Sequence, residues 1–423
     1  MIKTNKLLYL LSFMVAMFMG CEDTKDDEAN TPSLTTPSNY SFESRFNTGE
    51  SSVKYTGQVV RNLLINDIKT QMGTDAGSGN AATLLSMMAN DDESRTILTT
   101  TTPASMQTTY RSISSSHLND RLEAVEDITL TGYGHHAGDQ IAAWVTSCVA
   151  DGKTDADGRR LDQLVQKTLW GAVSYWQGTS KYMKNIETDA NVMPDDGDPY
   201  SDMEHHWDES FGYFGAARDY NTAYTDDTRK NGPPVDSNND GAIDFTTEFN
   251  IGWAVTAAKR DLVSNVTVDY DLTKAVMDAY LEGRTLIHNQ APLAEILAQR
   301  DLVVQNWEKV VAAVTIHYVN DVIADMAALF PANPTAGPTD AACADLNNHW
   351  GEMRGYANGL LYNSFKQISD PDLNTVLTTM GTEPVHPSDG ETAFYTYHGL
   401  LATTVKNTLQ AAYGFSDSHM ENW

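Results

Sequence analysis

Residues 206–213 read H-W-D-E-S-F-G-Y, and residues 349–356 read H-W-G-E-M-R-G-Y. Both stretches fit H-W-x-E-x-x-G-Y, and each matched pair is 143 positions apart. At about 100° per helical residue, the His, Glu and Tyr of one stretch fall within roughly 60° of one another. One narrow helix face therefore carries an imidazole, a carboxylate and a phenol, and it does so twice. We call these stretches the first and second octads.

The His and Glu of each octad, His206 with Glu209 and His349 with Glu352, are one helical turn apart. Helical bundles use this ligand pair for transition metals, and a second pair from a facing helix would complete four ligands for iron or zinc. The alternative is structural. The octad tryptophans would then be core anchors, and the glycines would permit close helix approach. The sequence leaves both interpretations open.

Around the octads, apolar residues recur at intervals of three and four, which is the helical period. Long alternating runs of β-branched residues are missing. The pattern predicts an all-α protein with at most a short N-terminal extended or β segment at residues 40–55. The predicted helices span residues 58–72, 81–90, 112–125, 136–149, 159–185, 202–219, 247–261, 272–288, 293–329, 339–367 and 392–413.

Both octads have helix start signals before them. Ser201 with Glu204 fits a capping box, and Pro338-Thr339-Asp340 supplies a cap and an acidic first turn. A loop-rich linker at residues 231–246 separates residues 40–230 from residues 247–423. One octad in each part predicts two four-helix-bundle-like halves related by duplication, although chance is the alternative source of the shared pattern.

The N-terminus has the composition of a signal peptide. Two lysines precede an apolar run too short for a permanent membrane span, so residues 1–20 are predicted to be removed. The sequence F-M-G-C at residues 18–21 resembles a bacterial lipobox, which predicts lipidation of Cys21 and anchoring to the outer membrane, on its periplasmic face or at the cell surface. Residues 21–39 are polar enough to form a flexible tether. We expect no other stretch that is long and apolar enough to cross a membrane.

The predicted mature chain carries 26 basic and 57 acidic residues, a net charge of −31. So acidic a chain repels phosphate backbones, which excludes nucleic acid as the expected partner. Besides Cys21, only Cys148 and Cys343 are present, so no disulfide framework is possible. In an oxidising envelope compartment these two could form one bridge or remain separate buried thiols.

A second chemical signal is the sequence D-S-N-N-D-G-A-I-D at residues 236–244. Asp236, Asn238, Asp240 and Asp244 occupy ligand positions 1, 3, 5 and 9 of a calcium loop, and Gly241 stands at the sharp turn. Position 12 is not acidic, since Glu248 comes one residue late. The stretch predicts a structural calcium site, and a turn rich in Asn and Asp is the equal alternative.

The segments at residues 204–215 and 307–320 resemble an uncharacterised family of Bacteroidetes-type envelope lipoproteins of unknown function, itself similar to the imelysins. That resemblance implies two helical bundles related by duplication and a role in iron uptake with an outer-membrane receptor. Imelysins carry G-x-H-x-x-E. Residues 134–139 here read G-H-H-A-G-D, so the resemblance adds His136 and Asp139 as candidate metal ligands and leaves open which segment is the counterpart.

The usual enzyme motifs are absent: the sequence has no H-E-x-x-H, no G-x-S-x-G and no phosphate-binding glycine loop. We therefore expect a non-catalytic lipoprotein that binds iron, another metal or a metal complex and assists its uptake. The alternative is a metal-dependent, peptidase-like hydrolase with Glu209 or Glu352 as general base.

Overall fold

The computed structural model describes residues 33–262 and 270–423. The predicted signal peptide, Cys21 and most of the tether lie outside the described residues. Residues Thr35–Trp423 form one compact unit. The predicted domain boundaries and the duplication of two halves stay predictions.

The all-α prediction is confirmed, since the described ranges contain helices and isolated bridges but no strand. The predicted N-terminal segment is extended, with a single antiparallel bridge between Glu43 and Ser51. The principal helices are α1 (Thr56–Asp75), α2 (Ala82–Ala89), α3 (Asn119–Glu123), α4 (Ala137–Asp151), α5 (Leu161–Leu169), α6 (Asp202–Phe214), α7 (Asp226–Asn231), α8 (Trp253–Arg260), α9 (Leu272–His288), α10 (Leu293–Ala332), α11 (Ala344–Gly359), α12 (Asp370–Met380), α13 (Glu391–Leu400), α14 (Lys406–Tyr413) and α15 (Asp417–Asn422).

Helix α9 has the predicted bounds, whereas the helix predicted at residues 112–125 is wrong. Only Tyr110–Ser112 and Asn119–Glu123 are helical there, because local serine hydrogen bonds compete with the helix. The Ser116 N–H donates to the Ser114 hydroxyl across 3.1 Å. After α5 the chain continues through two π-helical segments, η2 (Trp170–Tyr175) and η3 (Gln177–Met183).

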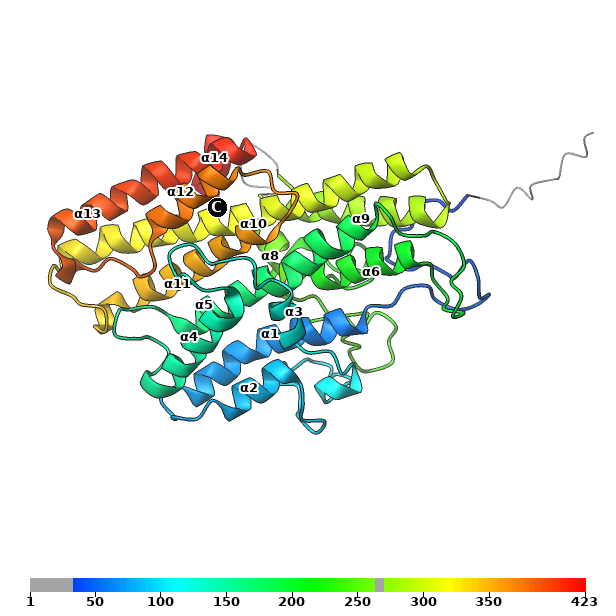
Figure 1. Ribbon diagram of the computed structural model, residues 1–423, viewed down its shortest axis with the longest axis horizontal. Helices are drawn as coiled ribbons and strands as arrows, with labels where there is room; N and C mark the ends of the chain where they lie inside the picture. The colour runs from blue at the N-terminus through cyan, green and yellow to red at the C-terminus, as the bar shows by residue number, and fades with distance from the viewer. Residues whose placement is uncertain (1–32, 263–269) are drawn as a thin grey trace, which may run out of the picture. The chain divides into compact units, whose positions relative to one another are not determined.

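Helix α10 connects the two ends of the bundle (Figure 1). Its first half packs on α9, where the Asn306 amide donates to the Ala275 carbonyl, and its second half packs on α11. By length and composition α10 is apolar enough to cross a membrane, contrary to the sequence expectation. More than half of its most apolar window is buried, and Trp307 is fully buried, as in the core helix of a globular protein.

Buried polar groups fix the start of α6. The predicted capping box is confirmed, because Ser201 and Glu204 each accept from the other's backbone N–H. Arg284 of α9 donates to Glu204 across 3.0 Å and to Asp208 across 2.9 Å, and all three side chains are fully buried. The two remaining cysteines, Cys148 and Cys343, are buried free thiols.

Candidate functional sites at the octads

Both octads lie on helices, as predicted, and their tryptophans anchor them in the core. Trp207 of α6 donates to the Tyr280 carbonyl across 3.0 Å, and Trp350 of α11 donates to the Tyr397 hydroxyl across 2.9 Å. Both indoles are fully buried. A Cβ atom on Gly212 would lie 2.7 Å from the Cβ of Tyr55, so this glycine does permit a close approach.

The first-octad histidine is held by an aspartate outside the octad. His206 donates from Nδ1 to Oδ2 of Asp189 across 2.7 Å, and its ring stacks on Tyr182 with 5.5 Å between centroids. The Asn185 amide lies 3.4 Å from Nε2. Burial opposes the charged form of His206, but the hydrogen bond and charge of Asp189 outweigh it and raise the pKa. The side chain remains 26% exposed.

The second-octad histidine has the same kind of partner. His349 donates from Nδ1 to Oδ2 of Asp325 across 2.7 Å, and the hydrogen bond to Asp325 raises its pKa. The ring of Tyr318 lies 6.2 Å from its ring, and the His349 side chain is 30% exposed. Its Nε2 has no hydrogen-bond partner among the described residues. The imidazole therefore presents one ring nitrogen while the other is occupied.

The octad carboxylates are engaged differently. Glu209 accepts from the Gln58 amide across 2.7 Å. Glu352 accepts from the Tyr318 hydroxyl across 3.0 Å and from the Asn348 amide across 3.1 Å, and it faces Lys167 at 3.6 Å. The carboxylate of Glu352 is therefore fully engaged, whereas Glu209 accepts through Oε1.

Sequence reasoning missed the aspartate and tyrosine partners of the octad histidines. Tyr182 precedes Asp189 by seven positions, and Tyr318 precedes Asp325 by seven. The octad tyrosines lie beside these partners, since Tyr213 stacks on Tyr182 and Tyr356 stacks on Tyr318. The pattern Y-x₆-D therefore begins at Tyr182 and again at Tyr318, 136 positions apart, but it also begins at Tyr220, so the pattern alone would not have singled out these two groups.

The structure does not bring the candidate ligands into one four-ligand site. Helices α6 and α11 lie toward different ends of the bundle (Figure 1). The third candidate pair stands alone at the start of α4, where His136 Nε2 lies 3.1 Å from Asp139 Oδ2. Within residues 33–262 and 270–423, no group of three or more His, Cys, Asp or Glu side chains is placed to hold a metal ion.

Residues 236–244 are held by hydrogen bonds from their own side chains, which fit both the calcium loop and the turn rich in Asn and Asp. Asp236 accepts from the Gly241 N–H across 2.9 Å, and Asn238 accepts from the Asp240 N–H across 2.8 Å. Gly241 adopts φ +91°, which favours glycine. Glu248 accepts from the N–H groups of Ser237, Asn238 and Asp244, so the late glutamate faces the loop backbone.

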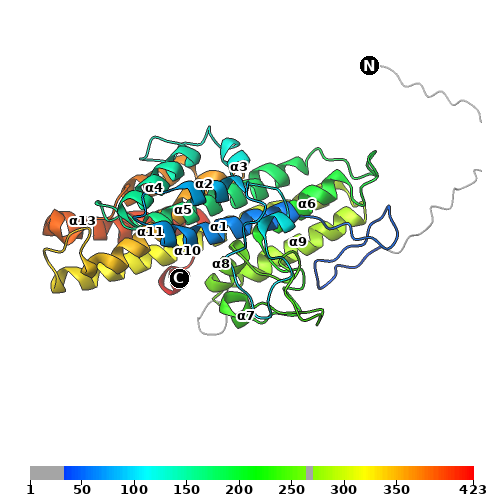
Figure 2. The same ribbon diagram turned by 90° about the horizontal axis from the view of Figure 1, so that it is seen from below.

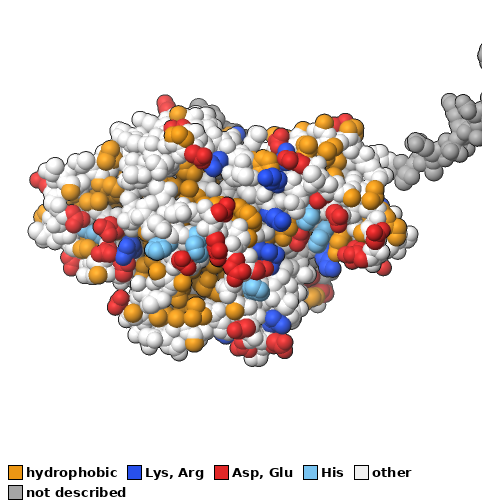
Figure 3. Space-filling view, in the orientation of Figure 1, with side chains coloured by type: hydrophobic (Ala, Val, Ile, Leu, Met, Phe, Trp, Pro, Cys, Tyr) orange, Lys and Arg blue, Asp and Glu red, His pale blue; other side chains and the backbone are white. Residues whose placement is uncertain are grey.

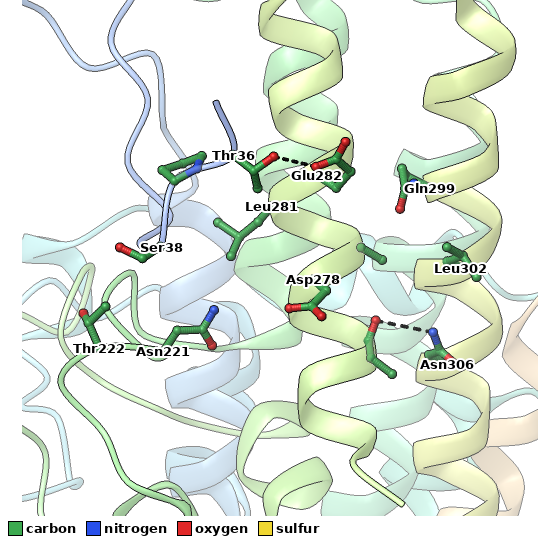
Figure 4. Close-up of a pocket in the computed structure, with 13 residues that line it drawn as sticks. Thr36, Ser38, Asn221, Thr222, Asp278, Leu281, Glu282, Gln299, Leu302 and Asn306 are labelled. Carbon is green, nitrogen blue, oxygen red and sulfur yellow. Dashed lines mark hydrogen bonds between the residues drawn. The ribbon is translucent and has the colours of Figure 1, made fainter. Parts of the chain in front are cut away.

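A cavity of about 690 Å³ lies between α9, α10 and residues 36–38, away from every candidate ligand. Figure 4 shows Asp278, Glu282 and Gln299 around it, with Thr36 donating to Glu282. None of the predicted site residues lines this cavity.

A family model described as a domain of unknown function, DUF4856, matches residues 37–333. The chain belongs to this family. The matched region includes the first octad, His136 and the loop at residues 236–244, whereas the second octad follows it. No curated protein and no solved structure matches the chain.

Proposed function

We propose that this chain is a non-catalytic cell-envelope lipoprotein that binds iron, another metal or a metal complex and assists its uptake. The His349–Asp325 pair carries the proposal. A metal-binding histidine commonly donates its second ring N–H to a carboxylate, which orients the ring and directs the other nitrogen at the metal. His349 has this arrangement, with Nε2 unpaired among the described residues and the side chain partly exposed.

A metal complex fits this arrangement better than a bare ion. Each octad offers one oriented imidazole, and the described residues hold no group of three potential ligands. A complex arrives with most of its coordination positions already filled, so one imidazole from the protein suffices. Lipidation at Cys21 would keep the protein at the outer membrane, beside an uptake receptor. The resemblance to the imelysins supports the same role.

The test measures bound metal and melting temperature together. Purified mature protein is loaded with the iron(III) complex of nitrilotriacetate, which leaves coordination positions open, and His206→Ala and His349→Ala are compared with His398→Ala, which removes a histidine outside the octads. We expect both octad variants to lose metal while the control retains it. Unchanged metal content with a lowered melting temperature in both octad variants would contradict the proposal, because it would show that the histidine–aspartate pairs stabilise the fold without binding metal.

A further inference from the structure

The chain has 57 acidic residues and only 28 basic ones. On the face shown in Figure 3, Lys and Arg side chains lie mixed with Asp and Glu. Basic side chains outnumber acidic ones where α1, α5, α8, α10 and α11 meet near the middle of the bundle (Figure 2). There, four basic residues surround Glu352. We call them the basic cluster: Lys69, Lys167, Lys259 and Arg260.

Glu352 is already neutralised by one member of the cluster. Lys167 Nζ lies 3.6 Å from Oε1 of Glu352 and 5.3 Å from the centre of the Tyr356 ring. The Tyr318 hydroxyl donates to the same oxygen. One carboxylate and one ammonium group cancel in charge, which leaves Lys69, Lys259 and Arg260 as an excess of positive charge.

These three cations have no ion-pair partner in the described ranges. Lys259 is exposed at the end of α8, and Lys69 and Arg260 are partly buried. The Nε of Arg260 is buried and donates no hydrogen bond to the residues that the structure describes. A buried donor without an acceptor costs free energy, so the site is incomplete as it stands.

The surrounding charges do not remove the excess. Lys69 faces Lys167, Lys259, Glu352 and the pair of Asp162 with Arg160, whose carboxylate and guanidinium lie 2.7 Å apart and cancel. Arg260 faces Asp321 as well as Glu352, but Asp321 also faces the imidazole of His349, whose pKa is raised, and burial raises the pKa of the Asp321 carboxyl itself.

Burial and mutual repulsion disfavour the charged forms of these cations in the free protein. Burial, followed by the charge of Lys167, lowers the pKa of Lys69 to about 8. Burial, followed by the charge of Arg260, lowers the pKa of Lys259. An anion among them would relieve the mutual repulsion and accept from the unpaired Nε.

We infer that the basic cluster is a binding site for a small anion with several carboxylate or phosphate oxygens. The anion is small because Lys167 is buried and the Arg260 Nε is enclosed, beyond the reach of a folded partner. The exposed Lys259 gives access from solvent. This inference goes beyond the proposed function, since it requires no metal.

Calorimetric titration of the mature chain with inorganic phosphate and with citrate tests the inference. We expect one-to-one binding of at least one anion, weakened by added salt, and the tighter of the two identifies phosphate or carboxylate as the preferred group. Lys69→Met, Lys259→Met and Arg260→Met should each weaken binding about tenfold. Lys184→Met, which removes an exposed lysine outside the cluster, should leave it unchanged.

The pH dependence gives a second readout. Because the anion binds the charged form of Lys69, affinity should fall as the pH rises through about 8, and Lys69→Met should lose that step. Circular dichroism confirms that each variant folds. The inference is overturned if neither anion binds at millimolar concentration, or if Lys259→Met and Lys184→Met bind equally well.

Discussion

His349 of α11 donates from Nδ1 to Oδ2 of Asp325 on α10, across 2.7 Å. The interaction joins two helices at a partly exposed position and raises the pKa of His349. His206 and Asp189 have the same donor, acceptor and distance. In each octad, a carboxylate 17 or 24 positions earlier in the sequence therefore orients the histidine ring and raises its pKa.

Asp325→Asn should lower the pKa of His349, because the hydrogen bond to the carboxylate is the main cause of its elevation. A folded-state pKa above the unfolded value of about 6.5 contributes stability below that value, and the contribution is lost as the pH rises through the folded pKa. The variant should therefore lose more stability at about pH 5 than at about pH 9. Histidine NMR titration and urea unfolding at both values measure these effects.

The matched control is His206, whose pKa depends on Asp189 in a different part of the bundle. Its titration should be unchanged in Asp325→Asn. An equal loss of stability at both pH values would show that Asp325 acts by packing rather than through the charge of His349.

Most helices were predictable because their apolar stripes are local patterns. The octad helices and α9 were found in this way, and α9 even to its ends. The helix predicted at residues 112–125 failed where serine side chains bind their own backbone. The aspartate and tyrosine partners of the octad histidines could not be predicted from local patterns, because tertiary packing determines which residues lie beside the octads. The basic cluster illustrates the same limit, since Lys69 and Arg260 are separated by 191 positions.

Arg284→Met should be strongly destabilising. Its guanidinium is fully buried between Glu204 and Asp208, and its removal leaves the buried carboxylate of Asp208 without a cation, while Glu204 keeps only Arg45. Breaking such a buried pair costs about 3–5 kcal/mol, which chemical denaturation would detect. Lys274→Met removes a cation from an exposed pair with Asp278 and should have little effect. Similar stability of the two variants would contradict this account of the α6–α9 contact.

Gly212→Ala should destabilise the first octad by overpacking. The added Cβ would lie 2.7 Å from the Cβ of Tyr55, which is a buried residue, and such crowding costs about 1–3 kcal/mol. Gly399→Ala is the matched substitution, because this helical glycine has no atom within 4 Å of the added carbon. It should raise the melting temperature slightly, as alanine favours helix. An unchanged free energy of unfolding in Gly212→Ala would show that α1 can move away from α6 without loss of stability.

Calcium should raise the melting temperature of the protein, because any ligand selective for the folded state stabilises it. Asp236, Asn238 and Asp240 already accept the backbone hydrogen bonds that shape a calcium loop, and their carboxylate and amide oxygens are suitable ligands. Asp240→Ala should abolish the shift, whereas Asp227→Ala, which removes a highly exposed carboxylate of α7, should retain it. A chelator should reverse the shift in the parent. An unchanged melting temperature in millimolar calcium would leave these residues as a turn stabilised by its own side chains.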